Sequence, residues 1–305
     1  MYHRLAESAF DPWGLAVSPH RFEEQLDWLS RKRDVLPLAE FAELQRKGRL
    51  PARAIAITFD DGYACNLGVG APLLAAYGKP ATIFLAIDPI ARGREFWWDE
   101  LERIMFHSQA DSLTLDASGI SRRVDLVDSP SISSRWSPGS APQNPRQRAF
   151  MDFWGVLRTM DPADQAAAIS ALRAQAGTDI GPRPSHRPLT HEEIRATGNN
   201  ALIDFGAHTM SHPVLSEHDE AFQRREIDDS RRLCAEVTGK APSSFAYPFG
   251  DYDRRTVQIV RDAGFTAAVT TRRGAVNART SRFELPRIQV GDWSAAELAS
   301  ALAQA

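Results

Sequence analysis

Short apolar runs alternate along the chain with stretches in which apolar residues recur every three or four positions. The apolar runs, each short enough for a β-strand, span residues 54–59, 81–87, 202–207, 244–247, 266–271 and 284–290. The helix-like stretches span residues 19–31, 70–78, 147–159, 162–176, 218–238, 252–263 and 294–303. Strands that alternate with amphipathic helices are typical of repeated βα units around a parallel sheet. The pattern therefore predicts an α/β protein.

Residues 111–146 interrupt this rhythm. The segment opens with the alternating runs Leu113-Thr114-Leu115 and Val124-Asp125-Leu126 and continues through Ser129-Pro130-Ser131 and other stretches rich in serine, proline and glycine. This is loop composition, and the segment is longer than most connections in compact domains. We expect an excursion inserted in one connection of the sheet. The chain, residues 1–305, is then one domain with an inserted loop region.

Composition and charge exclude several classes of partner. The 305 residues are 43% hydrophobic and carry a formal net charge of −3, so no global basic field attracts nucleic acid. No run approaches the roughly 20 apolar residues of a membrane-spanning helix. The first residues, Met1-Tyr2-His3-Arg4, lack the apolar core of a signal peptide, which predicts a cytoplasmic protein.

Two adjacent carboxylates, Asp60 and Asp61, follow the strand predicted to end at Phe59. Carboxylates that close an apolar strand are costly to bury unless something compensates their charge. A divalent metal does so, with one carboxylate as its ligand while the neighbour holds or deprotonates a water molecule. The alternative is an ordinary turn, because Asp61-Gly62 is a common turn pair. The pair alone leaves both interpretations open.

Two histidines, His208 and His212, follow the predicted strand at 202–207. Histidines at positions i and i+4 share a face over one helical turn, so both imidazoles reach one ion. Two histidines and one aspartate make a three-ligand site that leaves positions for water and substrate, as catalytic metals require. The alternative is a pair of surface histidines on a loop. Their place after an apolar strand, together with the aspartate pair, favours the metal site.

A third segment, Phe245-Ala246-Tyr247-Pro248-Phe249-Gly250, lies at the end of the predicted strand at 244–247. Proline, an aromatic residue and glycine just past a strand are common in turns that only end the strand. They also suit a groove wall, formed by Tyr247, Pro248 and Phe249, whose backbone N–H faces a reacting carbonyl. The residues do not separate these two interpretations.

These three segments, in this order, resemble the polysaccharide deacetylase family, carbohydrate esterase family 4. The likeness rests on residues 58–62 (Thr-Phe-Asp-Asp-Gly) and 208–212 (His-Thr-Met-Ser-His), and it covers essentially the whole chain outside 111–146. It implies a distorted, TIM-like (β/α)7 barrel. It also implies that Asp60 is the general base and that Asp61, His208 and His212 bind zinc or a similar divalent ion.

The chain departs from the usual family pattern at the third motif. That motif normally carries an arginine that orients the base aspartate, whereas here the matching stretch is Ala246-Tyr247-Pro248-Phe249. The motif that supplies a general-acid histidine is also absent downstream. A circularly permuted branch of the family moves the acid-bearing strand to the N-terminus, and Met1-Tyr2-His3 fits that motif. This resemblance predicts His3 as the general acid; the alternative is a histidine in an unstructured terminus.

Three further residues are candidates for the substrate groove. Trp98 and Asp99 follow the strand predicted to end near Ile87, where an aromatic face would suit a sugar ring and a carboxylate its hydroxyls. Of Trp97 and Trp98, at least one is expected in the core, because neighbours on a regular element point in different directions. Arg287 lies in a late strand and either supplies a charge near the site or forms a structural ion pair.

The sequence therefore predicts a metal-dependent amide hydrolase that removes acetyl from an N-acetylated amino sugar. The metal is expected to be Zn²⁺, although two histidines and a carboxylate also accept Co²⁺, Ni²⁺ or Mn²⁺. Two rival functions keep the same fold. One is hydrolysis of a non-sugar or cyclic amide, which the missing arginine leaves open, and the other is a catalytically silent carbohydrate-binding barrel. The sugar and the oligomeric state are not predicted.

Overall fold

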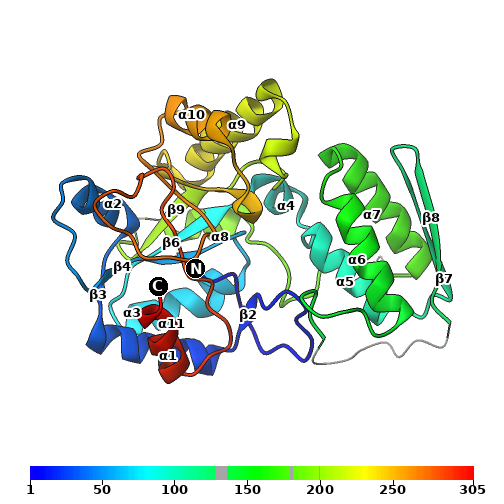
Figure 1. Cartoon of the computed structure of the whole chain (residues 1–305), viewed down its shortest axis with the longest axis horizontal. Helices are drawn as coiled ribbons and strands as arrows, with labels where there is room; N and C mark the ends of the chain where they lie inside the picture. The colour runs from blue at the N-terminus through cyan, green and yellow to red at the C-terminus, as the bar shows by residue number, and fades with distance from the viewer. Residues whose placement is uncertain (128–135, 179–180, 199) are drawn as a thin grey trace. The chain divides into compact units, whose positions relative to one another are not determined.

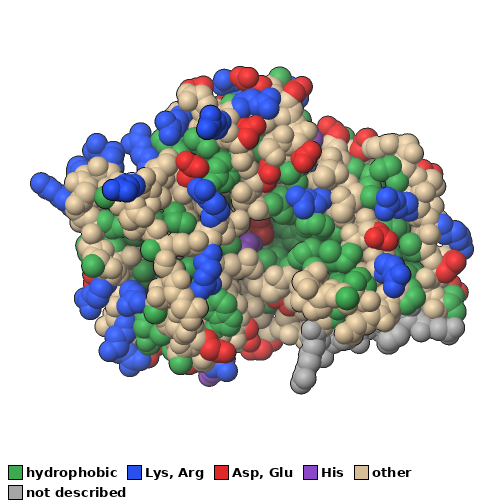
Figure 2. All heavy atoms as spheres, viewed as in Figure 1, with side chains coloured by type: hydrophobic (Ala, Val, Ile, Leu, Met, Phe, Trp, Pro, Cys, Tyr) green, Lys and Arg blue, Asp and Glu red, His purple; other side chains and the backbone are tan. Residues whose placement is uncertain are grey.

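The computed structural model describes residues 1–127, 136–178, 181–198 and 200–305, which form two compact units. The larger unit comprises residues 1–7, 15–93 and 188–305, and the smaller comprises residues 8–14 and 94–187. No helix among the described residues is both long enough and apolar enough to span a membrane. On the face drawn in Figure 2, acidic and basic side chains are interspersed, in keeping with the small net charge.

The larger unit is built on a five-stranded parallel sheet with the order β11-β10-β9-β6-β5 (Figure 1). Its strands are β5 (Ile57–Phe59), β6 (Ala81–Leu85), β9 (Ile203–Ala207), β10 (Ser244–Ala246) and β11 (Ala267–Val269). All five coincide with predicted apolar runs, and β5, β6, β10 and β11 are buried along their whole length. Strands buried on both faces read as continuous apolar runs, which is why the pattern was visible in the sequence.

Helices and short strands surround this sheet. The helices are α1 (Pro19–Lys32), α2 (Leu38–Arg46), α3 (Ala71–Ala76), α4 (Ile87–Arg92), α8 (His191–Thr197), α9 (Glu220–Thr238), α10 (Arg254–Asp262) and α11 (Ala295–Ala303). Single turns form η1 (Asn66–Gly70), η2 (Leu215–Glu217) and η3 (Pro248–Gly250). Two small parallel pairs join β1 (Arg4–Leu5) to β2 (Ala16–Val17) and β3 (Asp34–Val35) to β4 (Ala54–Ile55).

Two segments without regular strand structure close the sheet into a ring. Beside β11, the N–H of Thr270 donates to the carbonyl oxygen of Leu285 at 2.9 Å, and the N–H of Leu285 donates to Ala268 at 3.0 Å. Farther along the same segment, the N–H of Val290 donates to the carbonyl oxygen of Met1 at 3.0 Å. The predicted strand at 284–290 is therefore present as a ring member, with only an isolated bridge at Leu285.

Residues 1–2 fill the last place in the ring, beside β5. The N–H of Tyr2 donates to Thr58 at 2.8 Å and the N–H of Asp60 donates back to Tyr2 at 2.9 Å. The five strands and the two closing segments make seven ring members, which confirms the expected distorted α/β barrel. The N-terminus follows the late segment 285–290 in space, as the permuted resemblance implies.

Aromatic packing anchors this N-terminal segment. The ring of Tyr2 lies 5.1 Å from that of Phe22 and 5.4 Å from that of Phe59, and its hydroxyl donates to Gln25 at 3.0 Å. Tyr2 is only 2% exposed. Residues 1–2 are thus core, which removes the alternative of an unstructured terminus ahead of His3.

The smaller unit combines three helices with a β-hairpin. These are α5 (Trp97–His107), α6 (Pro145–Leu157), α7 (Pro162–Ala176) and the antiparallel pair β7 (Ser112–Ala117) and β8 (Ile120–Asp125). The expected excursion at 111–146 falls inside this unit and begins with regular strands, because Leu113 and Leu115 alternate into its core. Its Ser129-Pro130-Ser131 stretch lies outside the described residues.

Candidate active site

The predicted polar motifs meet at the carboxyl ends of the parallel strands. Asp60 and Asp61 follow β5 directly, and His208 follows β9 directly. Parallel strands end at the same edge of the sheet, which is where βα-barrels build their active sites. All three side chains are 2% exposed. Groups of this polarity buried together require mutual compensation or a bound ion.

Asp61, His208 and His212 form a cluster that suits a metal ion. The Nε2 atoms of His208 and His212 each lie 3.5 Å from one carboxylate oxygen of Asp61. One ligand atom from each residue lies within 4.8 Å of the other two, and all three residues are buried. Two imidazoles and one carboxylate make a donor set that binds zinc and neighbouring transition metals. The residues present therefore fit a divalent ion.

A backbone carbonyl orients the first of these histidines. The Nδ1 of His208 lies 2.7 Å from the carbonyl oxygen of Ala246, at the end of β10. A proton on Nδ1 satisfies this contact and leaves the Nε2 lone pair for a metal, as outer partners of metal-binding histidines do. The His212 ring is held 4.7 Å from that of His208 and 4.5 Å from that of Phe249. Burial lowers the pKa of His212 to about 3, which keeps its imidazole neutral, as a ligand must be.

The expectation that His208 and His212 share a helical turn is wrong. Residues 208–214 are irregular, and Thr209 and His212 have φ angles of 65° and 59°. The Thr209 hydroxyl donates to the carbonyl oxygen of His208 at 2.6 Å and accepts the N–H of His212 at 3.0 Å. This tight turn, not a helix, brings the two imidazoles together.

Glu226, on α9, fixes the same turn through three hydrogen bonds. Its carboxylate accepts the N–H groups of Met210 and Ser211, both at 2.9 Å, and the hydroxyl of Ser211 at 2.8 Å. Burial raises the pKa of Glu226, and these hydrogen bonds act in the opposite direction. A carboxylate that accepts three hydrogen bonds inside the protein fixes the backbone between the two histidines.

Asp60 is held by a fork of hydrogen bonds from Arg287. The two terminal nitrogens of the guanidinium donate to the two oxygens of the carboxylate at 2.7 and 2.6 Å. Arg287 also donates to the hydroxyl of Thr58 at 3.1 Å and to the carbonyl oxygen of Thr270 at 2.9 Å. Burial by itself raises the pKa of Asp60, but the charge and hydrogen bonds of Arg287 outweigh it and bring the pKa well below its usual range.

The Arg287 contact resolves the departure found at the third motif. The usual arginine is absent beside Tyr247, but a guanidinium from segment 285–290 reaches the same aspartate. Arg287 therefore fits both interpretations given above. It supplies a charge near the site, and it does so in a buried ion pair with Asp60.

The carboxylates of Asp60 and Asp61 lie close enough to His3 to affect its pKa. Burial lowers the pKa of His3, while the carboxylates of Asp61 and Asp60 act to raise it; burial prevails. The backbone of His3 is fixed by Asn66, whose amide donates to the His3 carbonyl oxygen at 2.7 Å. The side chain is half-buried. His3 therefore lies within the electrostatic influence of Asp60 and Asp61, and the roles of His3 as acid and of Asp60 as base stay predictions.

The third motif contributes its residues unequally. The Tyr247 side chain is fully buried and donates to the carbonyl oxygen of Phe283 at 3.0 Å, so it packs in the core and not in a groove. Pro248 is buried, and Phe249 is half-buried with a φ of 55° and lies against His212. Gly250 has a φ of 70°, and a Cβ there would lie 1.9 Å from the hydroxyl oxygen of Thr271. This close approach requires glycine.

Trp98 and Asp99 lie on α5 in the smaller unit. Both are buried, and the Trp98 ring stacks at 4.6 Å on Phe96 and meets Trp97 edge-on at 5.6 Å. The backbone carbonyl of Asp99 accepts a hydrogen bond from Arg183 at 2.9 Å. Both tryptophans are core residues of that unit, and a groove role for Trp98 and Asp99 stays a prediction.

Residues 157–268 match the family model described as polysaccharide deacetylase. A poly-beta-1,6-N-acetyl-D-glucosamine N-deacetylase of Staphylococcus aureus (strain N315) is 38% identical over 71 residues. Those residues are 23% of this chain and 24% of that protein. The Bacillus subtilis (strain 168) protein YxkH is 27% identical over 112 residues, 36% of this chain and 40% of YxkH. The chain thus spans well under half the length of these relatives.

Solved structures with the same fold cover nearly the whole chain. The Streptococcus pyogenes deacetylase PplD, in complex with acetate, has a TM-score of 0.62 and 19% identity, over 99% of this chain and 95% of that chain. IcaB from Ammonifex degensii has a TM-score of 0.60 and 19% identity, over 100% and 95%. At this identity the likeness establishes the fold.

Glu226→Gln is expected to weaken metal binding by about 10- to 100-fold, because outer partners of metal ligands carry effects of that size. Glutamine can turn its oxygen to the two backbone N–H groups and its N–H₂ to the Ser211 hydroxyl, but it removes the negative charge that strengthens these hydrogen bonds. Titration with Co²⁺, followed by its visible absorption, measures the affinity. The matched control is Glu236→Gln on the exposed face of α9, where Glu236 pairs with Arg232. Equal affinities in the two variants would contradict a role for Glu226 in aiming the histidines.

Proposed function

We propose that this chain hydrolyses the acetamide of an N-acetylated amino sugar with a divalent metal, Zn²⁺ being the first candidate. The observation that carries the proposal is the buried Asp60–Arg287 pair beside the Asp61, His208 and His212 cluster. Such a pair keeps one carboxylate ionised and aimed at a place where a metal would bring water. The family-model match at residues 157–268 and the name of the S. aureus relative support the sugar amide as the substrate.

The residues divide the reaction among them. Asp61, His208 and His212 would hold the ion, which when bound polarises the amide carbonyl and acidifies a water molecule. Asp60, ionised and fixed by Arg287, accepts the proton of the attacking water. His3 delivers a proton to the departing amine nitrogen, which is too basic to leave as an anion. A backbone N–H near Phe249 would stabilise the oxyanion.

The structure weakens one rival function. Hydrolysis of a non-sugar or cyclic amide was open because the motif arginine is missing, but Arg287 supplies a guanidinium to the same aspartate. The missing motif arginine is therefore no longer a reason to prefer a non-sugar or cyclic amide as the substrate. The silent carbohydrate-binding barrel becomes an outcome of the experiments below.

Acetate release from N-acetylglucosamine oligomers, including a β-1,6-linked series, tests the proposal. We expect release by metal-loaded protein, loss of release after chelation, and a decrease of about 10²-fold or more in Asp60→Asn, which removes the general base. Asp262→Asn, at an exposed position of α10, is the matched control. A protein that holds one metal per chain, binds the oligomers and releases no acetate would be a carbohydrate-binding barrel.

Arg287→Lys is expected to lower kcat by about 10- to 100-fold with little change in KM, because the lysine keeps a charge but cannot hold both oxygens of Asp60. Steady-state kinetics on the best oligomer separates kcat from KM. Metal content measured on the same samples should remain one ion per chain. If KM rises while kcat is unchanged, Arg287 contacts the substrate and does not position the base.

His3→Ala is expected to slow amide hydrolysis by about 10²- to 10⁴-fold, the range for a lost general acid. An activated aryl acetate should be affected far less, because an aryloxide leaves without a proton. The ratio of the two rates is the measurement, and His20→Ala, at an exposed position of α1, is the control. Equal losses on both substrates would rule out His3 as the acid.

A further inference from the structure

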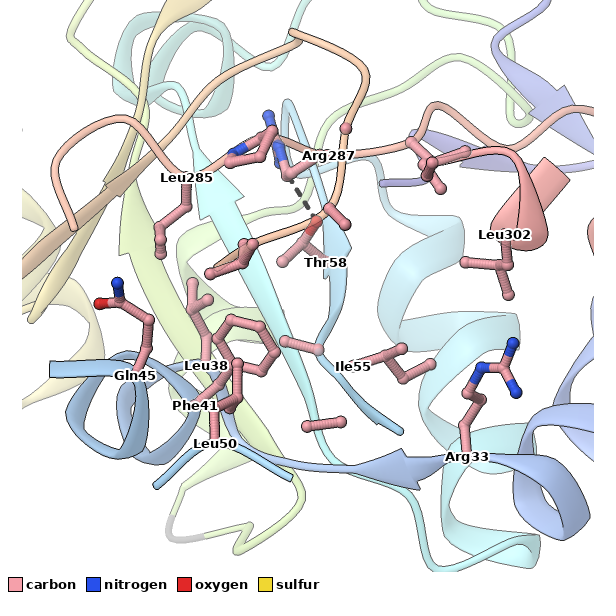
Figure 3. A pocket seen from close by; sticks show the side chains of 18 of the residues that line it. Arg33, Leu38, Phe41, Gln45, Leu50, Ile55, Thr58, Leu285, Arg287 and Leu302 are labelled. Atoms are coloured by element: carbon pink, nitrogen blue, oxygen red, sulfur yellow. Dashed lines mark hydrogen bonds between the residues drawn. The ribbon is translucent and has the colours of Figure 1, made fainter. Parts of the chain in front are cut away.

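A cavity in the larger unit is lined by Arg287 and Thr58, which contact each other near Asp60. It has a volume of about 500 Å³ and reaches from these two residues to Ala54 and Ile55 in β4 (Figure 3). Its apolar lining comes from three helices, α1, α2 and α11, and from β4 in the larger unit. The residues are Leu29, Leu38, Phe41, Ile55, Leu298 and Leu302. The active site occupies the opposite, carboxyl edge of the sheet, so the two spaces are distinct.

This cavity opens to solvent and is not an internal packing void. A volume of about 500 Å³ lies within the range of small-molecule sites, which are mainly apolar with a few polar groups. Leu38, Phe41 and Ile55 all face this space in Figure 3. The cavity therefore has the size and lining of a ligand site.

Several charged groups line the cavity, among them the Met1 ammonium, which donates to the carbonyl oxygen of Ile288 at 2.9 Å, and the terminal residue Ala305. Arg287 is paired with Asp60 and Arg53 with Asp34, while the side chain of Gln45 donates to two backbone carbonyl oxygens. Arg33 differs: among the described residues, no carboxylate pairs with it. Its guanidinium lies 5.0 Å from the centre of the Trp28 ring and donates to the carbonyl oxygen of Lys32 at 3.1 Å. Figure 3 shows Arg33 extending toward Leu302 at the edge of the cavity.

We propose that this cavity binds a monocarboxylate with an unbranched apolar chain. The chain lies against Leu38, Phe41 and Ile55, and the carboxylate pairs with Arg33 at the edge. A guanidinium without an acidic partner beside an apolar space complements an anion that carries an apolar tail. This site is separate from the proposed hydrolase, and it stands or falls independently of acetate release.

Calorimetric titration with decanoate, kept below its micelle concentration, tests the site. We expect one decanoate per chain, and Kd at least about tenfold weaker in Arg33→Gln, the effect of losing one charged hydrogen bond. The matched control is Arg31→Gln, two residues earlier in the last turn of α1, where Arg31 pairs with Asp27 in solvent. Arg31→Gln should leave Kd unchanged. Leu302→Trp, which fills the cavity, should abolish binding while the melting temperature shows that the protein is folded.

Two outcomes would overturn the proposal. The first is no binding of decanoate to the unsubstituted protein. The second is binding that Arg33→Gln and Leu302→Trp leave unchanged, which indicates adsorption elsewhere. Decanol, which has the same chain without the charge, is the comparison ligand: equal affinity for decanol and decanoate would show an apolar site without the carboxylate specificity proposed here.

Discussion

The forked contact between Arg287 and Asp60 is the interaction on which the site depends. Both side chains are nearly inaccessible to water, at 8% and 2% exposure, so neither charge could remain there without the other. The pair also joins the two ring members that flank residues 1–2, since Asp60 follows β5 and Arg287 lies in segment 285–290. The contact that joins these ring members therefore also fixes the position and the charge of the Asp60 carboxylate.

Backbone strain gathers around this pair. Five described residues other than glycine have positive φ angles, and four of them, Asp61, Thr209, His212 and Phe249, belong to the site. Such conformations persist only where surrounding contacts over-determine them. Glu226 and the Thr209 hydroxyl supply those contacts for the histidine turn. The site is thus held in a geometry that the local chain would not adopt by itself.

The sequence predicted most of the frame and the three side chains, Asp61, His208 and His212, that lie together in the cluster suited to a metal ion. Apolar runs marked all five strands, because each is buried against helices, and the motif residues lie where those strands end. The helical spacing of His208 and His212 was misleading, since a tight turn satisfies the same spacing. The partner of Asp60 could not be derived, because 227 positions separate it from Arg287. Glu226 was hidden among the many charged residues of α9, whose pattern does not distinguish a buried carboxylate from a solvated one.

The place of the N-terminal segment in the ring affects how the order of segments along the chain relates to their order in space. Residues 1–2 sit between β5 and segment 285–290, so the ring has a seam where the chain enters and leaves it. A closed ring has no first member, and the seam can migrate from one connection to another while every functional group keeps its neighbours. A barrel whose chain entered the ring at another connection would keep the same cyclic order of segments. A comparison that proceeds linearly breaks at the seam and shows two fragments where the molecules share one circle.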